Sequence, residues 1–321
     1  MGTTPLNALI IGAGSIGGLI DSPDSEAISS HAHAYAVSPD TKLIAICEPY
    51  ETNVLLFQKK WGKITCYTSL EHVPEDSTFE IASIASSTAQ HAEHLLTLLE
   101  RPDCFSILCE KPLVATAKEF RLLKKVLKQT PKKILIHLMR RYNPSFIALS
   151  DRLRAGEFGH ILGFSGTCTK GLLHNGSHLL GVLTHFFGKI TALTPIYAQR
   201  VDGDLCGDFA VGFDRVHGVV NVLNDPGYSF FELTLWYENS VIKIIDGGQR
   251  IEILSKIPSP HYEGYFTLEL TETIQTDLSR YALHSLEFLL RESDNVCRAI
   301  LKEHLHLHKM IFKTFNKENL A

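Results

Sequence analysis

The sequence predicts an α/β protein with two domains, and three observations support this. Strands alternate with helices from the start to about residue 138, which favours a doubly wound, mostly parallel sheet. From residue 161 strand-like runs follow one another with few helices between them, which favours a large, open, mainly antiparallel sheet in an α+β domain. The 321 residues, 45% of them apolar, are enough for two cores. We expect domains at 1–139 and 140–321.

Composition limits the classes of partner. Charged residues make up 21% and the net charge is −4, so no nucleic-acid partner is expected. No apolar run approaches the roughly 18 residues of a membrane span, so no membrane partner is expected. The start of the sequence, Met1 to Asn7, lacks the basic segment of a secretory signal. The seven cysteines are widely spaced without a C-x-x-C pair, which favours reduced, buried thiols in a cytoplasmic protein.

A glycine-rich turn follows the first predicted strand, residues 6–11. Its sequence matches G-x-G-x-x-G, with Gly12 allowing a tight turn, Gly14 admitting a pyrophosphate and Gly17 letting helix and strand pack closely. An isolated match of this kind is about as often an ordinary glycine turn. Its position after the first strand favours a dinucleotide-binding (Rossmann) domain, with cofactor contacts from Gly12, Gly14, Ser15, Ile16 and Gly17.

An acidic residue closes the second strand, residues 42–47. Glu48 could accept the ribose hydroxyls of the adenosine half and would repel a 2′-phosphate, so NAD is favoured over NADP. The alternative is a solvated acid at a strand end. The usual gap to this acid is about 20 residues, and here it is longer. We therefore expect an inserted loop over 19–30, with the helix resuming at 31–37.

The rest of the first domain places polar residues after two further strands. Helices are expected at 52–61, 89–100 and 115–128, and strands at 64–67, 79–85, 104–108 and 132–138. After the strand at 79–85 come Ser86, Ser87 and Thr88, which could line the nicotinamide ribose. Thr88 is the expected N-cap of the next helix, and His91 lies in its first turn. Glu110, Lys111 and Pro112 follow the strand at 104–108, at the sheet edge where ligands bind. Lys111 is expected between cofactor and substrate.

Two arginines lie at the domain boundary. Arg140 and Arg141 could bind cofactor or substrate oxygens, or could form a solvated bend before the helix 144–154.

The second domain is predicted to be rich in antiparallel strands. The expected runs are 161–169, 190–200, 208–213, 217–223, 229–237, 241–245 and 250–255, followed by helices at 277–291 and 294–316. A large open sheet can leave one face free to pack against a second subunit, so a homodimer or homotetramer through this sheet is expected.

Two clusters of histidines stand out. His174 and His178 precede and begin an apolar helix, 179–187, and would share a face if the helix began early enough. No third ligand is evident near them, so no metal is expected. A histidine here could take a hydroxyl proton, although two polar residues in a loop is the simpler interpretation. His304, His306 and His308 are expected on a solvated face of the last helix.

Together these motifs resemble the glucose–fructose oxidoreductase / inositol dehydrogenase / MocA family, in the right order over nearly the whole chain. The Glu110-Lys111-Pro112 element is the most specific of them. The resemblance implies NAD(P)-dependent hydride transfer to or from a hydroxyl of a sugar, nucleotide sugar or cyclitol. It assigns Lys111 to the site between nicotinamide and substrate and His178 to acid–base catalysis. We expect His174 to tune His178 or to relay its proton.

The sequence departs from the family pattern at two positions. His174 and Gly181 stand where aspartates are common, which puts sugar-hydroxyl binding at 181 in doubt. The His174 to His178 segment and the long loop after Gly17 resemble members associated with bacterial surface-polysaccharide biosynthesis. The alternatives are a reductase of the same fold acting on a non-sugar substrate, such as an imine or a linear tetrapyrrole, and a dinucleotide-binding or sensing protein with weak catalysis.

Overall fold

The computed structural model describes residues 4–315, and these form two compact units. The first comprises residues 4–139 and 279–302, and the second comprises residues 140–278 and 303–315. The expected domains began at residue 1 and ended at 321, and the last helix was expected to end at 316. Residues 1–3 and 316–321 lie outside the described residues.

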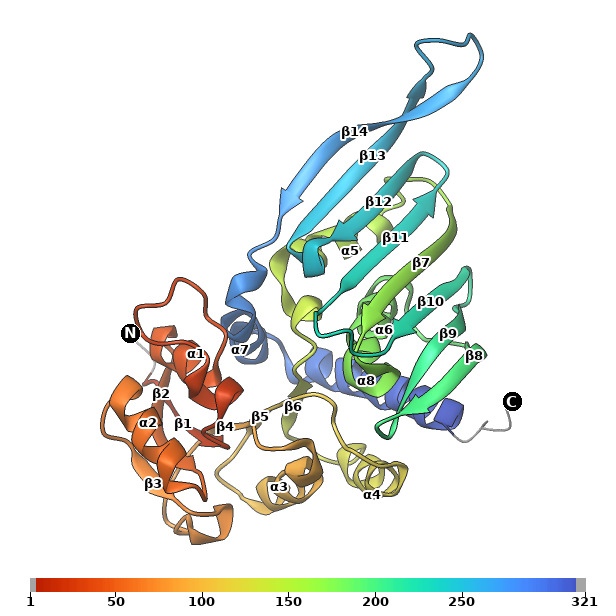
Figure 1. Ribbon diagram of the computed structural model, residues 1–321. Coiled ribbons are helices and arrows are strands. Elements are labelled where there is room, and N and C mark those ends of the chain that lie inside the picture. The colour runs from red at the N-terminus through yellow and green to blue at the C-terminus, as the bar shows by residue number, and fades with distance from the viewer. Residues whose placement is uncertain (1–3, 316–321) are drawn as a thin grey trace. The chain divides into compact units, whose positions relative to one another are not determined.

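The first unit is built on a six-stranded parallel sheet (Figure 1). Its strand order is β3-β2-β1-β4-β5-β6. The strands are β1 Leu6–Ile11, β2 Thr41–Cys47, β3 Thr65–Tyr67, β4 Ile81–Ile84, β5 Ser106–Cys109 and β6 Lys133–Ile136. The helices are α1 His31–Val37, α2 Glu51–Trp61, α3 Thr88–Glu100, α4 Ala117–Leu127, α7 Tyr281–Arg291 and the first part of α8 Asp294–Phe315. The predicted parallel sheet is confirmed.

The strand order places the predicted motifs side by side. Strands β1 and β4 pair at the point where the chain reverses its direction across the sheet. In such sheets ligands bind beyond the carboxyl ends of the strands at this point. The glycine turn follows β1, residues 86–88 follow β4, and Glu110 follows β5, which pairs with β4. One edge of the sheet therefore carries all three.

The segment 279–302 is a difference from the expected domain boundaries, which gave all of 140–321 to the second domain. This segment groups with the first unit because α7 packs on β5 and β6. Two backbone hydrogen bonds also tie it to the inserted loop, from Ile28 N to Ser279 O and from Ala282 N to Ile28 O. The order of elements along the sequence does not reveal that residues 279–302 pack on the first unit after the second sheet is complete.

The second unit contains an eight-stranded, mainly antiparallel sheet, in agreement with the prediction. Its order is β14-β13-β12-β11-β7-β10-β9-β8, and only the β7–β10 pair is parallel. The strands are β7 Ile161–Thr169, β8 Ala192–Val201, β9 Asp204–Gly212, β10 His217–Leu223, β11 Phe231–Tyr237, β12 Ser240–Ile245, β13 Arg250–Pro258 and β14 Phe266–Gln275. Strand β14 was not predicted. Its side chains are almost all exposed, so pairing with β13 rather than burial defines it.

The two faces of this sheet differ in character. Helices α5 Pro144–Arg154 and α6 Ser177–Phe187 and the later part of α8 lie on one face (Figure 1). Along β10 the side chains of Val220 and Val222 are buried, whereas Val219 and Leu223 are 37% and 45% exposed. On β11, Trp236 is 39% exposed. One face is therefore core and the other is open, with apolar groups among polar ones.

The expectation of a solvated histidine face on the last helix is wrong. His304 and His308 are fully buried, and the Nδ1 atom of His308 lies 2.9 Å from the backbone oxygen of His304. His306 reaches the oxygen of Ile190 at 2.7 Å. Helix α8 is enclosed on more than one side, which its mixed sequence of charged and apolar residues did not indicate.

All seven cysteines are free, and six of them are buried while Cys66 is half-buried, as expected for structural thiols. Among the described residues, no helix has both the length and the apolarity needed to cross a membrane.

Candidate functional site

The glycine turn has the shape that a dinucleotide requires. Gly12 adopts φ +94°, and a Cβ there would lie 2.6 Å from the backbone nitrogen of Ser86. A Cβ on Gly17 would collide with the oxygen of Gly12. Beside Gly14 no atom lies within 4 Å of such a Cβ, so backbone is exposed to an approaching ligand there. The turn leads into a short π-helical segment, η1 Ser15–Leu19, which carries Ser15 and Ile16. These residues fit a bound pyrophosphate.

Glu48 supports the glycine turn directly. It is only 4% exposed, and its Oε2 atom accepts a hydrogen bond from Ala13 N at 2.8 Å. Its Oε1 atom accepts from Tyr50 N at 3.0 Å. The carboxylate therefore links the ends of β1 and β2. A carboxylate has lone pairs beyond these two bonds, so its role toward the ribose stays a prediction.

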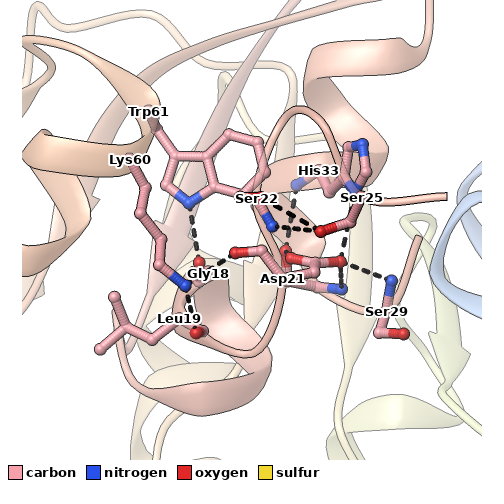
Figure 2. Close-up of polar contacts among 10 residues, drawn as sticks. Gly18, Leu19, Asp21, Ser22, Ser25, Ser29, His33, Lys60 and Trp61 are labelled. Carbon is pink, nitrogen blue, oxygen red and sulfur yellow. Dashed lines mark hydrogen bonds and ion pairs between the residues drawn. The ribbon is translucent and has the colours of Figure 1, made fainter. Parts of the chain in front are cut away.

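The inserted loop is tightly held, and the helix after it resumes at His31 as predicted (Figure 2). The Asp21 carboxylate accepts hydrogen bonds from Ser29 N at 2.7 Å, Ser30 N at 2.9 Å and the Ser30 hydroxyl at 2.5 Å. It also lies 3.2 Å from Nδ1 of His33. Because Ser30 caps α1 through its bond with His33 N, Asp21 fixes the start of that helix.

Helix α2 holds the other side of the loop (Figure 2). The Lys60 ammonium donates to the oxygens of Leu19 and Asp21, at 2.5 and 2.8 Å. The indole nitrogen of Trp61 donates to Gly18 O at 2.7 Å. The loop is therefore held through its backbone by α2 and through the Asp21 carboxylate by His33 of α1.

His91, predicted as a cofactor contact, connects two loops at the sheet edge. The side chain is 1% exposed, with Nδ1 2.8 Å from Pro112 O and Nε2 3.1 Å from Ser86 O. The Ser86 hydroxyl lies 2.9 Å from Nδ1 of His94. The expected N-cap at Thr88 is wrong: α3 begins at Thr88, and the exposed Ser87 is the N-cap residue, without a capping hydrogen bond from its side chain. The structure thus brings together the residues after β4 and the Glu-Lys-Pro turn.

Glu110 is held by two histidines that sequence reasoning missed. Its Oε1 atom lies 2.6 Å from Nδ1 of His137 and 3.2 Å from Nε2 of His31. Its Oε2 atom accepts a hydrogen bond from Lys111 N at 3.2 Å. The side chains of His31 and His137 are buried. His137 closes the strand next to β5, and a polar residue ending an apolar strand is the signal that could have suggested it.

The electrostatics of this cluster follow from its burial. Burial alone would raise the pKa of Glu110. The charges of His137 and His31 and their hydrogen bonds to the carboxylate have a larger, opposite effect, and they hold the pKa well below its usual value. Burial lowers the pKa of His31 in spite of Glu110. We therefore read the cluster as an ionised carboxylate that accepts hydrogen bonds from imidazole groups. Among the described residues, these three also form a group whose potential metal-ligand atoms all lie within 4.8 Å of one another.

The two arginines after β6 make contacts within the second unit. The Arg140 guanidinium stacks over the Phe231 ring at 3.7 Å and donates to Gly247 O at 2.9 Å. Arg141 is buried and pairs with Glu303 at 2.5 Å. These contacts favour a structural role, and cofactor binding by Arg140 and Arg141 stays a prediction.

In the second unit, His174 and His178 lie at a junction between two kinds of helix. A π-helical segment, η4 Gly171–Gly176, leads into α6 at Ser177. His178 is in the first turn of α6 and 8% exposed, whereas His174 is exposed. The four-residue spacing therefore does not place both on one face of a regular α-helix. Gly181 is buried within α6.

Asp204 fixes this junction and was not singled out from the sequence. Its carboxylate accepts hydrogen bonds from Leu173 N at 2.9 Å and His174 N at 3.0 Å. A side chain on Gly171, which has φ +78°, would collide with it. Burial raises the pKa of Asp204 although these backbone donors oppose the rise. The carboxylate thereby sets the direction in which α6 begins.

Comparison with known proteins matches the first part of the chain to a family model. Residues 6–137 match a family model described as an oxidoreductase family with an NAD-binding Rossmann fold. This match covers less than half of the chain, and it agrees with the resemblance of the motifs to the glucose–fructose oxidoreductase / inositol dehydrogenase / MocA family. The match covers the region that contains the glycine turn, Glu48 and the Glu-Lys-Pro turn, and it agrees with the predicted NAD cofactor.

Individual relatives are distant. The chain is 23% identical over 164 residues to scyllo-inositol 2-dehydrogenase (NADP(+)) IolW of Bacillus subtilis, covering 45% of each protein. It is 24% identical over 161 residues to D-glucoside 3-dehydrogenase of Escherichia coli, covering 50% of this chain and 42% of the relative. The matches thus span less than half the length of these relatives.

Solved structures share the fold over nearly the whole chain. Levoglucosan dehydrogenase in complex with NADH has a TM-score of 0.76 at 14% identity, covering 98% of both chains. An NAD-binding oxidoreductase of Klebsiella pneumoniae has a TM-score of 0.71 at 14% identity, covering 97% of this chain and 98% of its own.

We predict that the buried histidines make the fold sensitive to mild acid. Burial lowers the pKa of His31, His304 and His308, and that of His185 to about 3. A histidine that is neutral when folded but titrates near 6.5 when unfolded stabilises the fold above that pH, and the benefit is lost as pH falls toward the folded pKa. Each contributes at most about 1.4 kcal/mol per pH unit. Urea unfolding of wild type should show stability falling below pH 6.5.

The test compares the pH dependence of stability in two variants. His304→Gln removes a buried histidine, and His261→Gln removes an exposed one as the control. The first variant should show a shallower fall between pH 6.5 and 5, and the second should match wild type. Equal slopes for all three proteins would contradict the prediction.

Proposed function

We propose that this protein is an NAD-dependent dehydrogenase or reductase acting on a hydroxyl or keto group of a sugar, nucleotide sugar or cyclitol. The observation that carries the proposal is the shared sheet edge of the Rossmann unit, where the open glycine turn follows β1 and the Glu-Lys-Pro turn follows β5, with β4 between these two strands. The fold of levoglucosan dehydrogenase and the distant inositol and glucoside dehydrogenases support this class of substrate.

The chemistry divides between two side chains in the proposal. Bound NAD would accept the hydride from the carbon that bears the hydroxyl. His178 takes the hydroxyl proton, the O–H electron pair forms the second bond of the carbonyl, and the C–H electron pair leaves with the hydride. The Lys111 ammonium stabilises the negative charge that develops on the oxygen. His174, which is exposed on η4, is proposed as a group that tunes or relays the proton.

The experiment is to measure NADH formation from NAD with a panel of polyols, sugars and nucleotide sugars. Lys111→Met and His178→Ala should lower kcat by about 10²–10⁴-fold, because each removes a group that acts on the reacting oxygen. NADH binding, followed by fluorescence, should change much less. Loss of binding and turnover together would speak against these roles.

Two alternatives give different results in the same panel. Turnover of an imine substrate but of no hydroxyl compound would indicate a reductase of the same fold. Tight NADH binding with no turnover of any substrate would indicate a dinucleotide sensor. Activity confined to nucleotide sugars would support the narrower proposal of a role in bacterial surface-polysaccharide synthesis, which rests on the resemblance of the His174 to His178 segment.

Cofactor choice tests Glu48. A carboxylate at this strand end repels a 2′-phosphate, so wild type should bind NADH more tightly than NADPH. Glu48→Gln keeps the side-chain size and removes the charge, and the preference should fall by about tenfold or more. Because the Glu48 carboxylate also accepts from Ala13 N, binding of both cofactors should weaken somewhat. An unchanged preference would remove Glu48 from the cofactor site.

We further propose that the open face of the eight-stranded sheet joins copies of this chain. Trp236 and Leu223 are partly exposed on that face, among polar side chains. Trp236→Glu should lower the mass measured by light scattering after gel filtration, whereas Leu162→Glu, at a 64% exposed position near the start of β7, should leave it unchanged. A monomeric wild type would contradict the proposal.

A further inference from the structure

The network around Glu110 uses both oxygens of one carboxylate, whose side chain is 14% exposed. Oε1 faces the two imidazoles and Oε2 faces the amide of Lys111. An ionised carboxylate only accepts, so each histidine donates through the nitrogen that faces it. Glu110 is thereby oriented by donors from α1 and from the end of β6, and it holds the backbone of the next residue.

The same network reaches the inserted loop. His31 is the first residue of α1, so its position depends on where that helix starts. Asp21 fixes this start through the amides of Ser29 and Ser30 and through the Ser30 hydroxyl. A continuous series of hydrogen bonds and one helical turn therefore leads from Asp21 to the amide of Lys111.

We propose that His31 and His137 are positioning residues for Lys111, and that the inserted loop is a brace that sets them. The buried imidazoles keep Glu110 charged and in one orientation, and Glu110 fixes the Lys111 backbone from which the ammonium extends. This inference rests on the proposed role of Lys111 in hydride transfer. In this proposal the loop that follows β1 helps to position Lys111, which follows β5, and β4 lies between these two strands.

The distances favour hydrogen bonding over metal coordination. Both imidazole nitrogens approach the same oxygen, Oε1, and the shorter separation is 2.6 Å. Ligand atoms each about 2.1 Å from one tetrahedral zinc ion stand well over 3 Å apart. The 2.6 Å separation is that of a short, charge-assisted hydrogen bond.

The first experiment does not depend on activity. Protein labelled with [15N]lysine gives an amide signal for Lys111, which is identified by its loss in Lys111→Arg. His137→Leu and His31→Leu remove the donors to Glu110, and exchange of the Lys111 amide with solvent should become about tenfold faster or more. The amide of Lys133, bonded to Phe105 O in the sheet, is the internal control for folding and should not change.

Conservative variants separate donation from packing. Asparagine places an amide nitrogen near the position of imidazole Nδ1, and glutamine near that of Nε2. His137→Asn and His31→Gln should therefore restore slow exchange. Asp21→Asn should speed exchange of the Lys111 amide, whereas Asp24→Asn, at an exposed site in the same loop, should not. If His137→Leu does not fold, His31→Leu and Asp21→Asn decide the question from a different helix and loop.

The second experiment measures turnover on a hydroxyl substrate found in the panel. The leucine variants should lower kcat by about 10- to 100-fold through misplacement of Lys111, with KM and NADH affinity changed less than about twofold. The asparagine and glutamine variants should recover most of kcat. If the Lys111 amide exchanges with solvent at the wild-type rate in the leucine variants, His31 and His137 do not position Lys111, and the proposal is wrong even if the enzyme is active.

Three other outcomes of these experiments would each decide part of the proposal. Faster exchange with unchanged kcat would overturn the positioning role. Faster exchange with no oxidation of any hydroxyl compound would support the brace and count against the proposed function alone. Binding of one equivalent of Zn²⁺ in equilibrium dialysis, abolished in His137→Leu, would assign the cluster as a metal site and overturn the proposal.

Discussion

The largely buried carboxylate of Glu110 is the constraint on which the sheet edge that carries the glycine turn depends. An ionised group out of water must be paired and fully hydrogen-bonded, or it destabilises the fold. Here His31, His137 and the amide of Lys111 meet that requirement. Parallel pairing of β5 with β6 brings His137 into reach, and the start of α1 brings His31. The need of the Glu110 carboxylate for hydrogen-bond donors therefore ties together the ends of β5 and β6 and the start of α1.

Much of this architecture was predictable because its signals are local. Strand and helix periodicity gave the parallel and antiparallel sheets, and residues directly after strands, such as Gly12, Glu48 and Lys111, marked the ligand edge. The partners of Glu110 were not predictable in this way. They lie 79 and 27 residues from it, and only the strand order makes them neighbours.

Other failures have the same physical origin. His304 and His308 share one face of α8, and nothing in the sequence says that this face is covered. Asp204 was not singled out from the sequence, yet its carboxylate accepts hydrogen bonds from the amides of Leu173 and His174, which precede α6. In each case the side chain is polar, and its burial depends on an element distant in the chain. Hydrophobic periodicity does not report on such groups.

The inserted loop shows how a polar segment can be rigid. Serine-rich loops usually lie at the surface and vary in length. In this loop Asp21 turns the serines inward as donors, while Lys60 and Trp61 hold the backbone from α2. Because the loop ends where α1 begins, its length sets the start of that helix and hence the position of His31. A change of loop length that spared every residue of the glycine turn would still move His31 relative to Glu110. The inserted loop and the two histidines therefore form one connected network, in which the loop is tied through the start of α1 to the Glu110 carboxylate.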